Sequence, residues 1–167
     1  MITARDRAHA AHRGNRMAQL LVIFRVGTTR YGIGIDAVEE ILLDLPITRL
    51  PRAPRGVIGV VDARGRVVPV FDLHARFGAG RRVESNESRL VLVRLASGMV
   101  ALPVDEVDEV ASIEPSSVQR VGAPGCAPEM DYLAGVVHHR EQLVLWIEPE
   151  RLIPAAVQKI RRLPQAA

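Results

Sequence analysis

Carboxylate and histidine side chains are the groups of this chain that could take part in catalysis or metal binding, since both can transfer protons and bind cations. The carboxylates recur at matching positions of two similar segments, as Asp36 does with Asp105 and Glu40 does with Glu109. Acids that recur at hairpin ends and at the start of short helices are better explained as helix caps and surface charges. We therefore expect no catalytic residue and no metal site.

The other reactive residue types give the same indication. His138 and His139 are adjacent on a strand-to-turn segment, where neighbouring side chains point to opposite faces. Cys126 is the single cysteine, so the chain has no internal disulfide and no zinc knuckle, and it lies in a Gly/Pro-rich loop. Gly32 and Gly34 lie inside a strand-like alternation and open no helix, so they form no dinucleotide-binding loop. An enzyme is the least favoured interpretation.

The side chain best suited to recognition is that of Arg64, which stands beside Gly65 in a predicted hairpin turn. From such a turn a long guanidinium group can project into solvent and donate as many as five hydrogen bonds. By residue type alone, a solvated surface arginine is the simpler interpretation. A binding role for Arg64 depends on the pattern that surrounds it.

The predicted elements that position these side chains occur twice, because the sequence contains an internal repeat. Residues 21–41 recur as residues 90–110 at a constant offset of 69 positions, and residues 59–72 recur as residues 135–148 at an offset of 76. The seven extra positions match the Gly/Pro-rich segment 122–128. A duplicated unit of this size predicts two similar small subdomains, and the seam between them is a natural place for binding.

Short apolar runs of strand length, separated by turns, dominate both copies. Such runs predict small β-barrels rather than alternating strands and helices. Short helices are expected after Asp36 and from Asp105 to Val110, where each aspartate would cap a helical turn. A C-terminal helix is expected from Pro149 onward, with an interruption at Pro154.

The net charge of the chain is concentrated at its N-terminus. Four of its 22 Lys and Arg residues, but only one of its 19 Asp and Glu residues, lie within residues 1–16, so the formal net charge of +3 belongs to this segment. A nucleic-acid-binding protein would carry basic and stacking aromatic side chains on its folded body, so we expect no nucleic-acid partner. No apolar stretch approaches the roughly 18 residues of a membrane-spanning helix, and we expect a cytoplasmic protein without membrane insertion.

Seven sequence blocks resemble, in a fixed order, the CheW family of coupling proteins from bacterial chemosensory arrays. The resemblance covers roughly residues 20–153. The blocks are Tyr31-Gly32-Ile33, Val38-Glu39-Glu40-Ile41, Leu50-Pro51-Arg52-Ala53-Pro54, Gly59 to Gly65, Val67 to Leu73, Val104-Asp105-Glu106-Val107 and Tyr132 to Val136. The resemblance implies an all-β fold with short helices, in which the duplication yields two five-stranded SH3-like barrels with a hydrophobic groove between them. One departure from the family pattern is Asp62-Ala63, which precedes Arg64.

The expected domain organisation follows from the same blocks. We expect a disordered basic extension over residues 1–17, one CheW-like domain over residues 18–154, and a C-terminal helix or tail over residues 155–167. Within the domain, the two subdomains would span about residues 18–80 and 88–154. Whether the barrels exchange strands is left open, because two sequence copies need not coincide with two structural units.

The resemblance also implies a function. A member of this family is a non-catalytic adaptor without cofactors, which couples the cytoplasmic tip of a chemoreceptor to the regulatory domain of a CheA-type histidine kinase. It would be a monomer in isolation and would join rings and arrays at membrane-associated receptor clusters. The alternative is a CheW-like adaptor of a non-flagellar pathway, for pilus motility or surface sensing, that docks a kinase or methyltransferase without direct receptor contact.

The residues that would carry the binding can be named from the same blocks. The resemblance places Arg64 at the receptor-facing surface, near Glu40, and we expect these two side chains to pair. Val38 and its repeat-mate Val107 could face each other across the seam and, with Ile33, line the receptor groove through apolar contacts. Kinase contacts are expected at turn residues, namely Arg66, Gly98, His139 and Arg140.

Overall fold

The computed structural model describes residues 17–121, 130–158 and 160. The expected N-terminal extension, apart from residue 17, lies outside the described residues, as do the insert 122–128 and most of the expected C-terminal tail. Within the described ranges no helix is long and apolar enough to cross a membrane.

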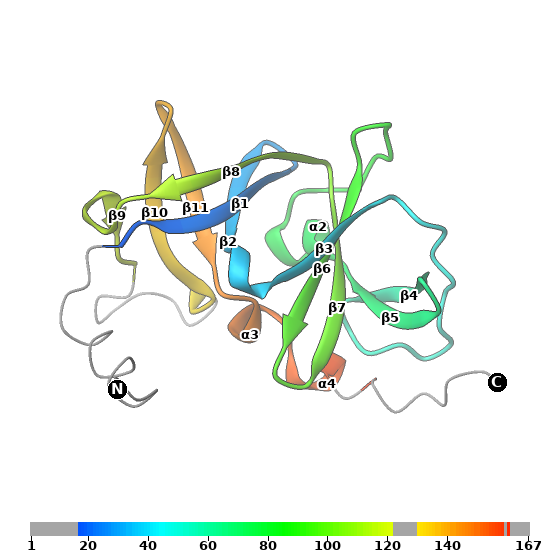
Figure 1. Cartoon of the computed structure of the whole chain (residues 1–167). Helices are drawn as coiled ribbons and strands as arrows, with labels where there is room; N and C mark the ends of the chain where they lie inside the picture. The colour runs from blue at the N-terminus through cyan, green and yellow to red at the C-terminus, as the bar shows by residue number, and fades with distance from the viewer. Residues whose placement is uncertain (1–16, 122–129, 159, 161–167) are drawn as a thin grey trace.

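Two mixed β-sheets form the body of the protein (Figure 1). The six-stranded sheet has the order β8-β1-β2-β11-β10-β9, and the five-stranded sheet has the order β3-β6-β7-β5-β4. The strands are β1 (Gln19–Val26), β2 (Thr29–Gly34), β3 (Val38–Leu43), β4 (Val57–Ala63), β5 (Arg66–Phe71), β6 (Arg89–Leu95), β7 (Gly98–Val104), β8 (Glu106–Ile113), β9 (Val118–Gln119), β10 (Leu133–His139) and β11 (Gln142–Ile147). The predicted all-β class with short helices is confirmed. The strand β9, at the edge of the six-stranded sheet, has two residues.

Each sheet contains strands from both sequence copies. The hairpin β1–β2 of the first copy lies between β8 and β11 of the second, and the hairpin β6–β7 of the second copy lies between β3 and β5 of the first. When each strand is matched with its repeat-mate, the first five strands of the six-stranded sheet therefore have the same order as the strands of the five-stranded sheet. The ranges 18–80 and 88–154 describe the sequence copies, but they do not coincide with the two sheets, because the N-terminal hairpins are exchanged.

The exchange buries both faces of each hairpin, and this explains why their sequences are almost continuously apolar. Leu21 and Ile23 of β1 belong to a cluster within the six-stranded sheet, and their repeat-mates Leu90 and Leu92 belong to one within the five-stranded sheet. Side chains on the other face of these strands belong to the largest cluster, which lies between the two sheets. Examples are Phe24 of β1 and Val91 and Val93 of β6. The seam is thus a hydrophobic core.

Two predicted helical segments are wrong. Residues Val38–Leu43 and Glu106–Ile113 are strands, because each pairs with an exchanged hairpin, and this long-range pairing overrides a weak local helical pattern. A single 3-10 turn, η1 (Ile35–Ala37), precedes β3, and Asp36 makes no capping hydrogen bond there.

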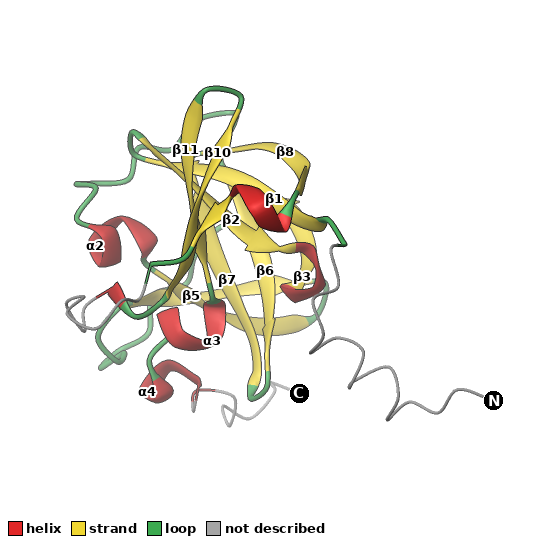
Figure 2. Cartoon of the chain, turned by 90° about the vertical axis from the view of Figure 1, so that its left-hand side faces the viewer, coloured by secondary structure: helices red, strands yellow, loops and turns green. Residues whose placement is uncertain are grey.

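Short helices lie between and after the strands (Figure 2). They are α2 (Leu73–Phe77), the 3-10 turn η2 (Pro115–Ser117), α3 (Pro149–Leu152) and α4 (Ala155–Gln158). The predicted interruption of the C-terminal helix at Pro154 is confirmed, since α3 and α4 lie on either side of it.

Glycines mark the places where a further segment crosses the hairpin β4–β5 and its repeat-mate β10–β11. A Cβ on Gly59 would lie 2.2 Å from the carbonyl oxygen of Thr48, and one on Gly135 would lie 2.7 Å from a methyl group of Val118. The ladder register shifts next to both glycines. The crossing segment therefore leaves no room for a side chain at either position.

Candidate functional site

The candidate site is built on the turn between β4 and β5. Ala63 pairs with Arg66, so Arg64 and Gly65 form a two-residue turn, with φ of 57° and 83°. Two positive φ values are typical of a type I′ turn, which matches the twist of a hairpin. The backbone N–H of Gly65 donates to Asp62 Oδ1 at 2.7 Å and holds the turn. This turn projects Arg64, whose side chain is 75% exposed.

The predicted pairing of Arg64 with Glu40 is confirmed. Arg64 Nη2 lies 2.6 Å from Glu40 Oε1, and the Glu40 side chain is 25% exposed. Burial alternates along β3, so Glu40 is partly covered while its neighbours Ile41 and Leu43 are exposed, at 39% and 69%. The ion pair therefore holds the guanidinium at the rim of the five-stranded sheet, with most of its surface still in solvent.

The seam residues have different positions from those expected. Ile33 is fully buried in the core between the sheets, so the prediction that it contacts a receptor is wrong for this conformation. Val38 and Val107 are partly buried and both pack against that same core. These two repeat-mates are therefore brought to one cluster, and their outer sides are the part of the seam that a partner could contact.

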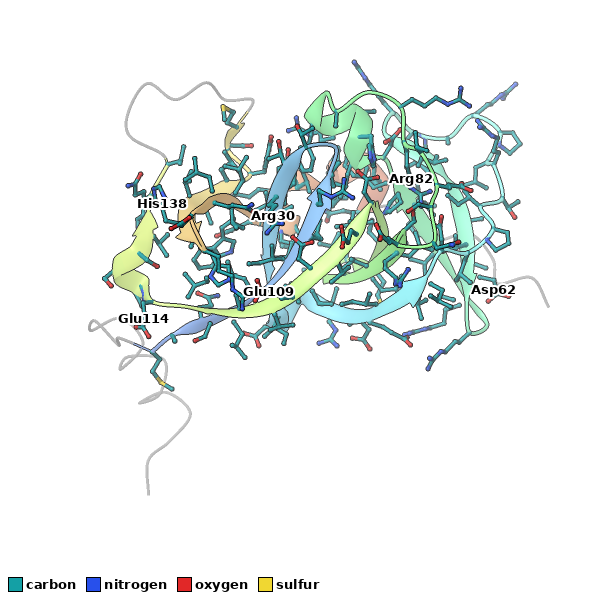
Figure 3. The ribbon with its side chains drawn as sticks, turned by 90° about the horizontal axis from the view of Figure 1, so that it is seen from above. Arg30, Asp62, Arg82, Glu109, Glu114 and His138 are labelled. Atoms are coloured by element: carbon teal, nitrogen blue, oxygen red, sulfur yellow. The ribbon has the colours of Figure 1, made fainter. Side chains whose placement is uncertain are left out.

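The four residues expected to contact a kinase do not form one surface. Arg66 and Gly98 line the same hollow of about 330 Å³, beside the parallel pair β5 and β7 and close to α4. His139 and Arg140 lie instead on the hairpin β10–β11 of the other sheet. In Figure 3, Asp62 of the hairpin β4–β5 and His138 of the hairpin β10–β11 lie at opposite sides of the molecule.

Sequence reasoning missed the partner of Arg140. Glu109 Oε2 lies 3.3 Å from Arg140 Nη2, and Glu109 Oε1 lies 3.1 Å from His139 Nε2. The repeat carried the signal for this pair, because Glu109 is the mate of Glu40 and Arg140 is the mate of Arg64.

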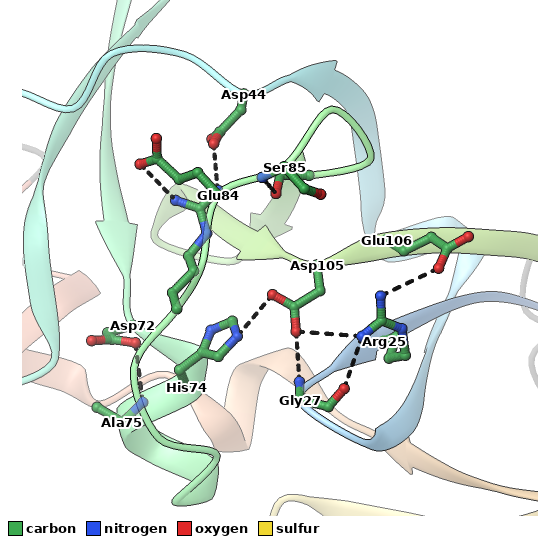
Figure 4. Close-up of polar contacts among 12 residues, drawn as sticks. Arg25, Gly27, Asp44, Asp72, His74, Ala75, Glu84, Ser85, Asp105 and Glu106 are labelled. Atoms are coloured by element: carbon green, nitrogen blue, oxygen red, sulfur yellow. Dashed lines mark hydrogen bonds and ion pairs between the residues drawn. The ribbon is translucent and has the colours of Figure 1, made fainter.

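A partly buried polar junction connects the two copies near the seam (Figure 4). Asp105 Oδ1 lies 2.9 Å from His74 Nε2, and Asp105 Oδ2 accepts a hydrogen bond from the N–H of Gly27 at 2.6 Å. Arg25 Nη1 lies 4.0 Å from Asp105 Oδ2, and Arg25 Nη2 lies 3.4 Å from Glu106 Oε2. The predicted role of Asp105 as a helix cap is wrong, and its carboxylate instead holds the β1–β2 turn.

Burial raises the pKa of Tyr31 above its ordinary value of 10.0, and Tyr132 raises it further. Tyr31 stacks on Phe77 with ring centroids 4.1 Å apart, inside the core. The exposed arginine and the carboxylate that holds it are suited to recognising a partner surface.

Comparisons with known proteins agree with the fold. A family described as "CheW-like domain" matches residues 20–157. The chain is 28% identical to the chemotaxis protein CheW of Rhizobium meliloti (strain 1021), over 135 residues that cover 81% of this chain and 87% of that protein. It is 36% identical to protein FrzA of Myxococcus xanthus over 104 residues, covering 62% of this chain and 64% of that protein. The crystal structure of the scaffolding protein TtCheW from Thermoanaerobacter tengcongensis matches with a TM-score of 0.73 at 30% identity, and covers 81% of this chain and 92% of that chain.

Proposed function

The chain belongs to the family of CheW-like domains, and from this premise we propose that it couples the cytoplasmic signalling tip of a chemoreceptor to the regulatory domain of a CheA-type histidine kinase. Members of the family are scaffold and adaptor proteins, so its work is to hold partners in place rather than to transform a substrate.

The Arg64–Glu40 pair is the observation that carries the receptor contact. Glu40 holds the guanidinium at the sheet rim, so part of the side-chain entropy of Arg64 is lost before a partner arrives. The donors that remain free can bind carboxylates of a receptor helix. Arg64 and Glu40 supply the polar rim, and Val38 and Val107 supply apolar contacts at the seam.

We place kinase docking at the hollow beside β5 and β7 that Arg66 and Gly98 line, whereas Arg64 pairs with Glu40 on β3. A kinase regulatory domain of the same barrel type would meet this end of the sheet head-to-tail. Such heterologous contacts close into rings when the rotation between subunits permits it.

The cellular setting follows from the partners. We assign the protein to the cytoplasm, where receptor tips lie, with recruitment to membrane-associated receptor clusters through the receptor itself. On its own it would be a monomer, and it would assemble into arrays only with receptor and kinase present.

The test is co-sedimentation of the whole chain with soluble receptor-tip fragments, with and without the kinase regulatory domain. Wild-type protein should bind both partners. The Arg64→Ala variant should lose receptor binding and keep kinase binding. The Arg66→Ala variant, which likewise lacks one exposed arginine, should keep receptor binding. Kinase binding without any receptor binding would instead support the adaptor that contacts no receptor. Binding of neither partner would overturn the proposal.

A further inference from the structure

A hollow at the end of the six-stranded sheet contains the single tryptophan of the chain. The hollow measures about 760 Å³, and Trp146 of β11, Arg120 after β9 and Arg151 of α3 all line it. This volume lies within the range of small-molecule sites, which are common in the mouths of β-barrels. In Figure 1, β9, β10 and β11 lie at the opposite end of the molecule from β4 and β5, so this hollow is separate from the one assigned to the kinase.

Trp146 lies in an apolar wall and has space beside it. Its backbone neighbours across the two ladders are Gly135 of β10 and Gly32 of β2, and neither of them carries a side chain. Trp146 packs against the buried cluster within the six-stranded sheet, yet it stays partly exposed and lines the hollow together with the buried Ile113 and Leu133. A half-covered indole in apolar surroundings offers a surface on which a planar ring can stack.

Arg151 is held beside this wall while most of its side chain stays in solvent. Its Nε lies 3.6 Å from Glu148 Oε2, and its Nη1 donates a hydrogen bond to the carbonyl oxygen of Asp131 at 3.4 Å. The side chain is nevertheless 59% exposed. The two contacts reduce the side-chain entropy that a ligand must remove, and the N–H groups that they leave unused can bind an anion.

Arg120 supplies a second guanidinium group from another part of the fold. It is exposed, and within the described part of the chain it forms no ion pair. Among the described residues that line the hollow, the acid is Glu148, which Arg151 already pairs with. Two arginines therefore face one glutamate, and the lining is positively charged.

An equivalent hollow in the five-stranded sheet lacks the aromatic ring. The residue before Arg49 bridges to β4 as the residue before Arg120 pairs with β10, so these two arginines are repeat-mates. Arg49 lines a hollow of about 730 Å³, in which no described residue is aromatic. The mate of Trp146 is Val70, which is fully buried. The combination of a ring with arginines thus belongs to the second copy.

We infer that the hollow beside Trp146 binds a small planar aromatic anion, whose ring stacks on Trp146 and whose phosphate or carboxylate group binds Arg120 and Arg151. The planar guanidinium matches both kinds of anion through paired hydrogen bonds. The apolar wall covers the ring and the arginines bind the charge, so the site requires both parts in one molecule. The site shares no residue with the surfaces proposed for the receptor and the kinase, and it would give the adaptor a small-molecule ligand.

Fluorescence of the whole chain tests the inference directly, because Trp146 is its single tryptophan. Adenosine 5′-monophosphate carries a ring with a phosphate, and benzoate carries a ring with a carboxylate, so these two probes distinguish the source of the anion. At least one of them should quench the emission of Trp146 saturably. Their uncharged counterparts, adenosine and benzamide, should bind at least about tenfold more weakly, and so should inorganic phosphate, which has no ring.

Substitutions then locate the probe. Arg120→Ala and Arg151→Ala should each weaken binding about tenfold, and the double variant should not bind. Arg49→Ala is the matched control, since it removes the repeat-mate of Arg120 at a distant hollow, and it should bind within about twofold of wild type. Isothermal titration replaces fluorescence for the ring itself: Trp146→Phe should keep binding and Trp146→Leu should lose it, with circular dichroism as the check of folding.

Each outcome decides for or against the site. Binding of adenosine 5′-monophosphate alone would identify a phosphate ligand, binding of benzoate alone a carboxylate ligand, and both would support the site. No saturable change with either probe up to about 10 mM would overturn the inference. Equal binding of charged and uncharged probes, or binding that survives the double arginine variant, would overturn it as well. Equal weakening by Arg49→Ala would show an effect of net charge rather than a site, and would also contradict it.

Discussion

The carboxylate of Asp105 accepts a hydrogen bond from the backbone N–H of Gly27, 78 residues earlier in the chain. The bond joins the start of β8 in the second copy to the turn of the β1–β2 hairpin in the first. It is reinforced by His74, whose Nε2 lies 2.9 Å from the other oxygen of the same carboxylate. One side chain thus fixes the exchanged hairpin to the strand that receives it.

Asp105→Ala should therefore destabilise the fold. The change leaves the N–H of Gly27 and the buried imidazole of His74 without their partner, and an unsatisfied buried polar group costs about 1–3 kcal/mol. Equilibrium denaturation in urea measures the loss. Asp36→Ala is the matched control, because Asp36 is the exposed repeat-mate of Asp105 and caps nothing. Equal stability of the two variants would contradict the role assigned to Asp105.

Arg64→Ala should leave the fold intact while it removes receptor binding. The side chain is 75% exposed, and an ion pair in such a position contributes no more than about 1 kcal/mol to stability. Circular dichroism and thermal unfolding check the fold, and co-sedimentation with receptor-tip fragments checks binding. A variant that unfolds would show that Arg64 is structural, contrary to its assigned role.

Glu141→Gly should stabilise the protein by about 0.5–1 kcal/mol, because the relief of a non-glycine residue in the left-handed region outweighs the chain entropy that glycine adds to the unfolded state. Glu141→Ala controls for the loss of charge and should give no such gain. The reciprocal change, Gly65→Ala, should destabilise, and no heavy atom lies within 4 Å of the added Cβ, so backbone conformation alone would cause the loss. Denaturant midpoints give all three values.

Gly59→Ala should cost about 1–3 kcal/mol or prevent folding, because the added methyl group would meet the backbone of Thr48 rather than a movable side chain. Gly34→Ala is the control, since its new Cβ would find its nearest neighbour at an ordinary 3.5 Å. If both variants are equally stable, the close crossing at Gly59 is not a constraint on the fold.

The stability of the protein should fall as the pH rises above 10. The folded state keeps the proton on Tyr31, whose pKa is raised by burial, while the unfolded chain releases it near its ordinary value of 10.0. The unfolded state then binds fewer protons than the folded state, so the free energy of unfolding declines with pH in this range and is unaffected below it. Tyr31→Phe should flatten that decline, and urea titrations across the range provide the measurement.

Much of the strand pattern could be predicted from the sequence, because apolar runs and turn residues act locally. The Arg64–Glu40 pair could also be predicted, although only through the family resemblance. The exchange of hairpins could not, since both copies offer chemically equivalent strands and an internal repeat does not say which copy pairs with which. The segment from Asp105 to Val110 was misassigned for the same reason, because its partner strand lies in the other copy.

The binding residues show a similar limit. Alternation within β2 does not say whether the neighbouring surface is solvent or the second sheet, so Ile33 was expected at a groove and is found in the core. The pair of Glu109 and Arg140 was implied by the repeat offsets, but the replacement of Gly65 by Glu141 made the second turn look different. Side-chain geometry was needed to show that the two turns are equivalent.

The exchange of hairpins also sets the order in which the protein can be completed during its synthesis. The five-stranded sheet has all its strands by Val104, whereas the β1–β2 hairpin, finished at Gly34, waits for β11, which begins at Gln142. At roughly 5–20 residues per second, that delay is about 5–20 s, during which β2 lacks its neighbouring strand and the apolar residues of the hairpin are only partly covered. Two sheets with the same strand order therefore close at different times, and the first hairpin to leave the ribosome is the last to be enclosed.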